Sequence, residues 1–190
     1  MITGAKVIRK YEIADSGKRI DIICKYYPCF MDIVDNFIED MEEDIKEEQD
    51  YNRRAEMGDL GVRVQTSGLS NPTQRDGVRH SALHTAILTG DFSGGELDGV
   101  SNVEEYLQDA ALVRVMIDDY SKFEKRVKEL VPRDKELFVA YLKQETSFMD
   151  IAESGGIQYE SAKQKVRRIK VNIKEQILRQ SKFIHVSYCL

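Results

Sequence analysis

The chain has 190 residues, of which 42% are hydrophobic and 32% are charged, and its formal net charge is −5. This composition is typical of a soluble globular protein with one domain or two small ones. No apolar run approaches the length of a transmembrane helix, and the amino-terminal residues lack the apolar core and cleavage signature of a signal peptide. We therefore expect a cytoplasmic protein without a membrane partner. The three cysteines form no CxxC pair and leave an odd count, which argues against a disulfide framework or a zinc site.

The first predicted helices extend from Ile20 to Asp50, where apolar residues recur every three or four positions. Pro28 should interrupt this pattern, because proline cannot continue a helix from within. The second of these helices is strongly acidic, with ten carboxylates and one lysine between Met31 and Asp50. A solvated helix face explains most such runs; a metal site, a surface that contacts RNA polymerase and a DNA mimic are the alternatives.

The middle of the chain alternates predicted loops and helices. A Gly-, Ser- and Asn-rich stretch predicts a flexible loop over about 51–71, although the alternation in 61–66 also fits a short strand. Asn71-Pro72 predicts the start of a helix that ends near Leu88, and a second flexible loop follows over about 89–102. Ser101 and Glu104 fit a capping box for a long helix that ends at Pro132. Its apolar surface suits either a bundle core or the seam of a homodimer.

We therefore predict an all-α fold with an amino-terminal helical region, 1–131, and a helix-turn-helix unit, 132–182, followed by a tail, 183–190. Helices are expected at 134–143, 147–154 and 158–180. Helix-turn-helix units need a small residue at the helix crossing and a tight turn, usually with Gly. Ala152 and Gly156 meet these needs, Ile157 is expected to plug the core after the turn, and Ser147 should cap the first helix.

The segment 158–182 is the basic part of an acidic chain. It holds eight Lys or Arg against two Glu, a net charge of +6, which leaves −11 for the rest. One face of this helix is apolar: Ala162, Val166, Ile169, Ile173 and Ile177. This stripe is longer than a compact helix-turn-helix needs, which indicates packing against the amino-terminal helices or a second subunit. The exposed basic face of this helix is a candidate for DNA binding; the alternative is that this face is simply solvated.

The polar residues of this helix are the candidate double-stranded DNA contacts. Major-groove base edges require forked or amide side chains, whereas phosphates require cations and N–H donors. The candidates for base contacts lie early on the exposed face: Gln158, Tyr159, Lys163, Gln164 and Arg167. The candidates for phosphate contacts are Lys165, Arg168, Lys170 and Lys174.

The segment "LFVAYLKQETSFMDIAESGGIQYESAKQKVRRIKVNI" resembles region 4 of sigma-70-type factors. The wider layout, with "CKYYPCFMDIVDNFIEDMEEDI" and "GVRVQTSGLSNPTQRDGV" upstream, resembles the ArpU and RinA families of phage and prophage late-gene regulators. The resemblance implies a sequence-specific DNA-binding protein that activates transcription. Lys163, Gln164, Arg167 and Arg168 match the recognition-helix face of the family, whereas Gln158 replaces the Ser or Thr common at its position.

Other function classes are less well supported by the sequence. A sigma-like factor acting with core RNA polymerase, a small terminase-like DNA-packaging protein and an interaction module without DNA remain as alternatives. No nucleophile–base pair and no phosphate-binding Gly loop with its Lys occurs, so we expect no enzyme and no cofactor. His80 and His84 have the spacing of a helical metal pair, but no third ligand is evident in the sequence. We therefore expect no metal site there and interpret both as ordinary surface histidines.

Overall fold

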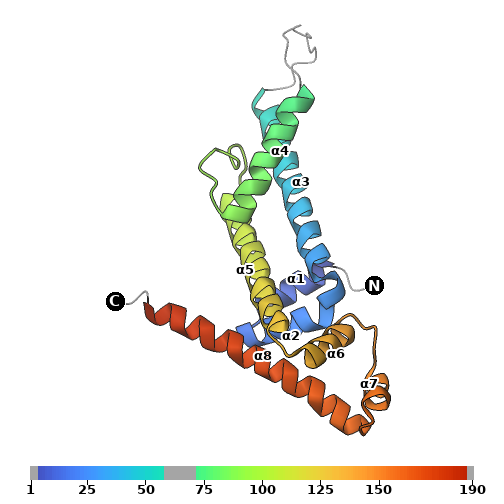
Figure 1. Ribbon diagram of the computed structural model, residues 1–190. Helices are drawn as coiled ribbons and strands as arrows, with labels where there is room; N and C mark the ends of the chain where they lie inside the picture. The colour runs from blue at the N-terminus through green and yellow to red at the C-terminus, as the bar shows by residue number, and fades with distance from the viewer. Residues whose placement is uncertain (1–3, 58–71, 188–190) are drawn as a thin grey trace. The chain divides into compact units, whose positions relative to one another are not determined.

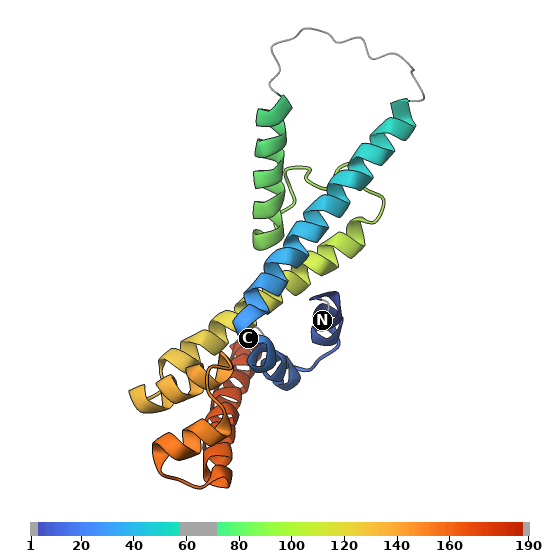
Figure 2. The same cartoon turned by 90° about the vertical axis from the view of Figure 1, so that its right-hand side faces the viewer.

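The computed structural model describes residues 4–57 and 72–187, and within these ranges every regular element is a helix (Figures 1 and 2). The predicted all-α class is confirmed. The helices are α1 Gly4–Glu12, α2 Ser16–Tyr26, the short 3-10 helix η1 Tyr27–Cys29, α3 Phe30–Met57, α4 Pro72–Thr89, α5 Val103–Lys128, α6 Pro132–Leu142, α7 Phe148–Gly155 and α8 Tyr159–Ser187.

Local sequence signals account for most helix ends. The side chain of Asp15 accepts the N–H of Lys18 at the start of α2. Pro28 lies in the 3-10 turn that separates α2 from α3, as expected. Ser147 caps α7 through a capping box with Asp150, so the predicted cap is confirmed. These side chains satisfy N–H groups that the first turn of a helix leaves without a partner.

Three sequence expectations differ from the structure. Helix α3 continues to Met57, so residues 51–57 are helical, while the rest of the predicted 51–71 loop and the predicted 61–66 strand lie outside the described residues. The predicted capping box at Ser101 is wrong, because its N–H is donated to Glu48 of α3, at 2.7 Å. Helix α8 runs to Ser187 and so covers most of the tail predicted for 183–190.

The described residues fall into two compact units. The first, called the α8 unit, comprises 4–32 and 117–187; the second, called the α4 unit, comprises 33–57 and 72–116. Helices α3 and α5 each contribute residues to both units. The sequence division at Pro132 differs from this grouping, because α1 and α2 belong with the carboxy-terminal helices.

The core of the α8 unit is aromatic and β-branched. Phe30 stacks on Tyr120 with ring centroids 5.6 Å apart, and Phe123 contacts the rings of both Tyr27 and Phe138. The Tyr11 hydroxyl donates a 2.7 Å hydrogen bond to Asp119, which ties α1 to the end of α5. Burial of such large apolar side chains contributes most of the free energy that holds helices together.

The core of the α4 unit is aliphatic. Its buried apolar side chains come from α3, α4, α5 and the segment between α4 and α5: Val34, Ile38, Met41, Ile45, Leu83, Ala86, Ile87, Leu97, Ala110, Val113 and Met116. Arg79 of α4 donates a hydrogen bond to Gln49 of α3, at 3.1 Å. The amides of Gln49 and Asn52 donate to backbone carbonyls of the segment between α4 and α5. Side chains of α3 therefore hold this irregular segment in place.

Candidate nucleic-acid interface

Helices α7 and α8 are joined by a tight turn at Gly156. This glycine has φ +57°, in the left-handed region that side chains with a Cβ rarely adopt. Its N–H donates to the carbonyl of Glu153 at 3.2 Å, and the N–H of Ile157 donates to the carbonyl of Ala152 at 3.0 Å. This pair of bonds is the Schellman arrangement, which ends α7 and satisfies its last carbonyl groups.

One apolar face of α8 packs inside the α8 unit. The five residues predicted for this face are all buried: Ala162, Val166, Ile169, Ile173 and Ile177. Ala152 of α7 is also buried, as expected for the small residue at the crossing. Because α8 contacts α2 as well as α6 and α7, the expected packing of the long apolar stripe against the amino-terminal helices is confirmed.

The predicted role of Ile157 is wrong. Its side chain is 40% exposed and therefore does not plug the core after the turn. The physical reason is its place in the Schellman arrangement, where the N–H points back at Ala152. Its side chain lies over the end of α7, with Cγ1 3.4 Å from the position that a Cβ on Gly155 would take.

The structure places the predicted contact residues in two groups. Six of the nine are exposed: Gln158, Tyr159, Lys163, Gln164, Arg167 and Arg168. These six lie in the first three turns of α8 or immediately before it, so they are close together along the helix. Tyr159 is anchored although it is 45% exposed, because its ring meets the edge of Phe148, which stacks on Tyr141.

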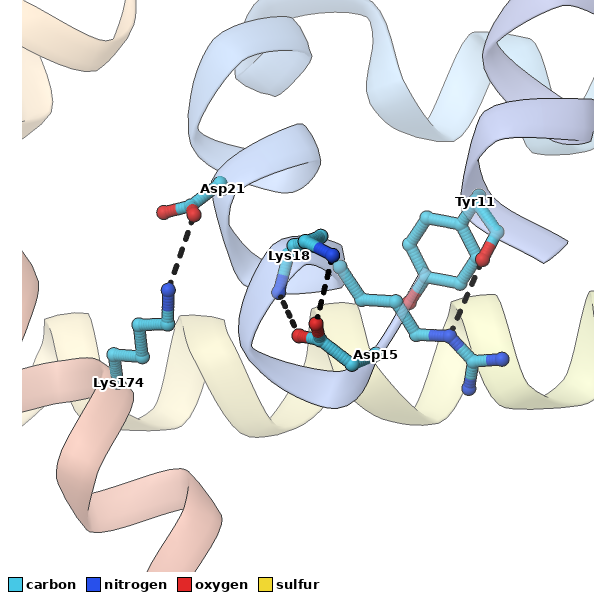
Figure 3. A network of polar contacts seen from close by, with 6 residues as sticks. Tyr11, Asp15, Lys18, Asp21 and Lys174 are labelled. Carbon is cyan, nitrogen blue, oxygen red and sulfur yellow. Dashed lines mark hydrogen bonds and ion pairs between the residues drawn. The ribbon is translucent and has the colours of Figure 1, made fainter. Parts of the chain in front are cut away.

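The other three predicted contact residues are held by carboxylates of neighbouring helices. Lys165 pairs with Asp134 of α6 at 2.9 Å. Lys174 pairs with Oδ2 of Asp21 of α2 at 3.0 Å (Figure 3). Lys170 pairs with Oδ1 of the same carboxylate, also at 3.0 Å. Asp21 and Asp134 could not be predicted as partners of these lysines, because neither is close to α8 in sequence. Only the contact of α8 with α2 and α6 brings them together.

The environment of Asp21 favours its charged form. Its partial burial acts against the charge, but the hydrogen bonds and positive charges of Lys170 and Lys174 outweigh this effect and lower the pKa of Asp21. Cys24 lies one turn further along α2, and burial raises the pKa of its thiol to about 12. The surface between α2 and α8 therefore holds one shared carboxylate, two lysines and a thiol whose pKa is raised.

Charge separates sharply between the two units. The segments 1–32 and 117–190 hold 21 Lys and Arg against 15 Asp and Glu, a net charge of +6. The intervening residues, 33–116, hold 7 Lys and Arg against 18 Asp and Glu, a net charge of −11. Since 158–182 alone carries +6, the remainder of those two segments is neutral overall. The net positive charge therefore comes from α8.

His80 and His84 lie in the α4 unit and face a buried carboxylate. Glu42 of α3 is 6% exposed, and its Oε1 is 2.8 Å from Nδ1 of His84. Its Oε2 is 3.3 Å from Nδ1 of His80. The sequence interpretation of both as ordinary surface histidines did not foresee this partner. Within residues 4–57 and 72–187, no group of three or more His, Cys, Asp or Glu side chains is arranged to hold a metal ion.

Among the helices of the described segments, none combines the length and the apolar character needed to cross a bilayer. No protein-family model matches the chain, and no curated protein or solved structure matches it either.

Proposed function

We propose that the chain is a sequence-specific, DNA-binding transcriptional regulator in which α7 and α8 form a helix-turn-helix. One observation carries this proposal: six polar or cationic side chains stand exposed at the start of α8, while its opposite face is buried in the unit. A rigid helix that presents such residues has the form needed to enter the major groove of double-stranded DNA. The net charge of +6 on the same unit favours a polyanion as partner.

The side-chain chemistry suggests a division of roles. Arg167 and Gln164 can each form two parallel hydrogen bonds with one base, Arg with guanine and Gln with adenine. Gln158, Tyr159 and Lys163 precede them on the exposed face and complete the candidate base contacts. Arg168 is the exposed candidate for a phosphate contact, which positions the protein without reading sequence.

The resemblance to sigma region 4 and to the ArpU and RinA regulators supplies the biological context of the proposal. The chain would act in the cytoplasm as a regulator of phage or prophage origin that activates late genes. RNA polymerase and a second copy of the chain are then the further candidate partners. The exposed acidic residues of α3 are the candidate surface for contact with the polymerase.

The test of this proposal is a comparison of two arginines on α8. In Arg167→Ala, binding to the selected DNA site should weaken by about 1–3 kcal/mol, because a base contact is lost. Arg179→Ala is the matched control, since this exposed arginine pairs with Glu175 at 3.6 Å and lies outside the candidate contact set. Fluorescence anisotropy with a labelled duplex measures both constants.

Equal binding by wild type and Arg167→Ala, on selected and random DNA alike, would contradict the groove assignment. Binding that requires core RNA polymerase would favour the sigma-like alternative. Ring-sized oligomers in light scattering would instead favour the terminase-like packaging protein, whereas dimers agree with the regulator.

A further inference from the structure

Asp21 is the one carboxylate that two α8 lysines share among the described residues. Lys174 donates a hydrogen bond to its Oδ2 at 3.0 Å, and Lys170 contacts its Oδ1 at the same distance. Both lysine side chains are about one-third exposed, so their ammonium groups are drawn toward α2 and away from free solution. Each carboxylate oxygen thus has its own cation.

The backbone of α2 is shaped to receive Lys174. Gly17, in the first turn of α2, is buried, and a Cβ at this position would lie 2.7 Å from Cε of Lys174. Any other residue would force the lysine chain to move. The side chain of Lys174 therefore passes close to Gly17. Its ammonium group reaches Asp21, one turn further along α2 (Figure 3). The absence of a side chain at Gly17 leaves room for this approach.

We infer that Asp21 is a specificity-determining residue that withholds Lys170 and Lys174 from DNA phosphates; the inference rests on the proposed function. Contacts between lysines and phosphates do not read sequence, so they strengthen binding to every duplex. Because these two lysines are paired with Asp21, the exposed candidates for base contacts contribute a larger share of the free energy of binding to DNA. Asp21 thereby lowers the affinity for random DNA and raises discrimination between sites.

The number of phosphates contacted can be read from the dependence of binding on salt. Each phosphate that a cation neutralises adds about 0.9 to the slope of log K against log salt concentration. Releasing two lysines should therefore steepen this slope by up to about 1.8. Asp21→Asn should show that change and should bind random duplexes more tightly, with a smaller ratio of selected-site to random-site affinity.

The experiment compares salt slopes on a random duplex for a set of full-length variants. Glu12→Gln is the control for the change in net charge, because this substitution removes the same single negative charge. Glu12 is exposed at the end of α1. In a Lys170→Gln/Lys174→Gln background, Asp21→Asn should change nothing. The double lysine variant with Asp21 intact should keep the wild-type salt slope. This measurement tests the inference even if Asp21→Asn does not fold.

The outcomes separate the inference from the function on which it rests. If the wild type binds DNA and Asp21→Asn binds with the same salt slope, the inference is overturned and the proposed function is left intact. A slope that falls in the double lysine variant would also overturn it, because the lysines would then already contact phosphate. Binding by Asp21→Asn without binding by wild type would support it. No salt-sensitive binding by any variant would overturn both.

Discussion

The cationic residues of α8 differ in what surrounds them, although their side chains are chemically alike. Arg167 and Arg168 are exposed, whereas Lys165, Lys170 and Lys174 each have a carboxylate partner on another helix. A cation with a fixed partner must give up that contact before it can bind a phosphate. The exposed arginines are therefore the stronger candidates for contact with DNA.

The cysteines of the amino-terminal helices provide a residue-scale prediction. Burial raises the pKa of the Cys24 thiol to about 12, while Cys29 is exposed in the 3-10 turn. Because the thiolate is the reactive form, iodoacetamide at pH 8 should modify Cys29 at least about ten times faster than Cys24. Peptide mass mapping over time resolves the two sites.

The same reaction in denaturant is the control, since unfolding removes the burial of Cys24 and should bring the two rates together. Equal rates in the folded protein would contradict the burial of the Cys24 thiol.

At the scale of the elements, the α2–α8 contact depends on the charge of Asp21. The lowered pKa means that the folded protein holds the charged carboxylate more strongly than the unfolded chain does. Its contribution is complete above the ordinary Asp pKa of about 3.9 and is lost as the pH falls through the lower folded value. Because Asp21 is partly exposed, this contribution should not exceed about 1 kcal/mol.

Urea unfolding between pH 6 and about pH 2 measures this contribution as the difference in unfolding free energy between wild type and Asp21→Asn. The wild type should be the more stable protein at pH 6, and the difference should shrink toward acid. A difference that stays constant over this range would contradict the role of the Asp21 charge, and Glu12→Gln again controls for the change in net charge.

Most helices were predictable from the sequence, because their ends depend on nearby residues. Ser147 and Gly156 act through hydrogen bonds to residues within five positions, and Pro28 acts through its fixed φ and missing N–H, so local patterns reveal them. The capping prediction at Ser101 failed because Glu48, which is distant in sequence, takes the N–H. Helix α1 was not predicted: its nine residues are too few for a clear apolar period, and Tyr11 and Val7 become buried only through tertiary contacts.

The candidate site was predictable in part for the same reason. Helical periodicity correctly divided α8 into a buried stripe and a polar face. It could not separate the exposed arginines from the lysines held by carboxylates of other helices, because Asp21 and Asp134 approach α8 only after folding. Periodicity assigns both Lys170 and Arg167 to the polar face of α8, although Lys170 contacts a carboxylate and Arg167 is exposed.

At the scale of the whole molecule, the net charge of −5 conceals two opposite charges. The α8 unit segments carry +6 and the intervening residues carry −11, so the chain has a basic part for a polyanion and an acidic part that a polyanion repels. Under the proposed function, DNA approaches through α8. The acidic part, which includes the exposed carboxylates of α3, is left for a protein partner such as RNA polymerase.

The most direct measurement of the central claim is selection from a pool of random duplexes with the full-length protein, followed by sequencing and by binding to the enriched site at several salt concentrations. We expect an enriched motif, affinity that falls steeply with salt, and relaxed specificity at one position of the motif in Arg167→Ala but not in Arg179→Ala. A two-fold symmetric motif would also support a dimer. A pool that stays random, with no salt-sensitive binding, would contradict the assignment of α8 as a DNA-reading helix.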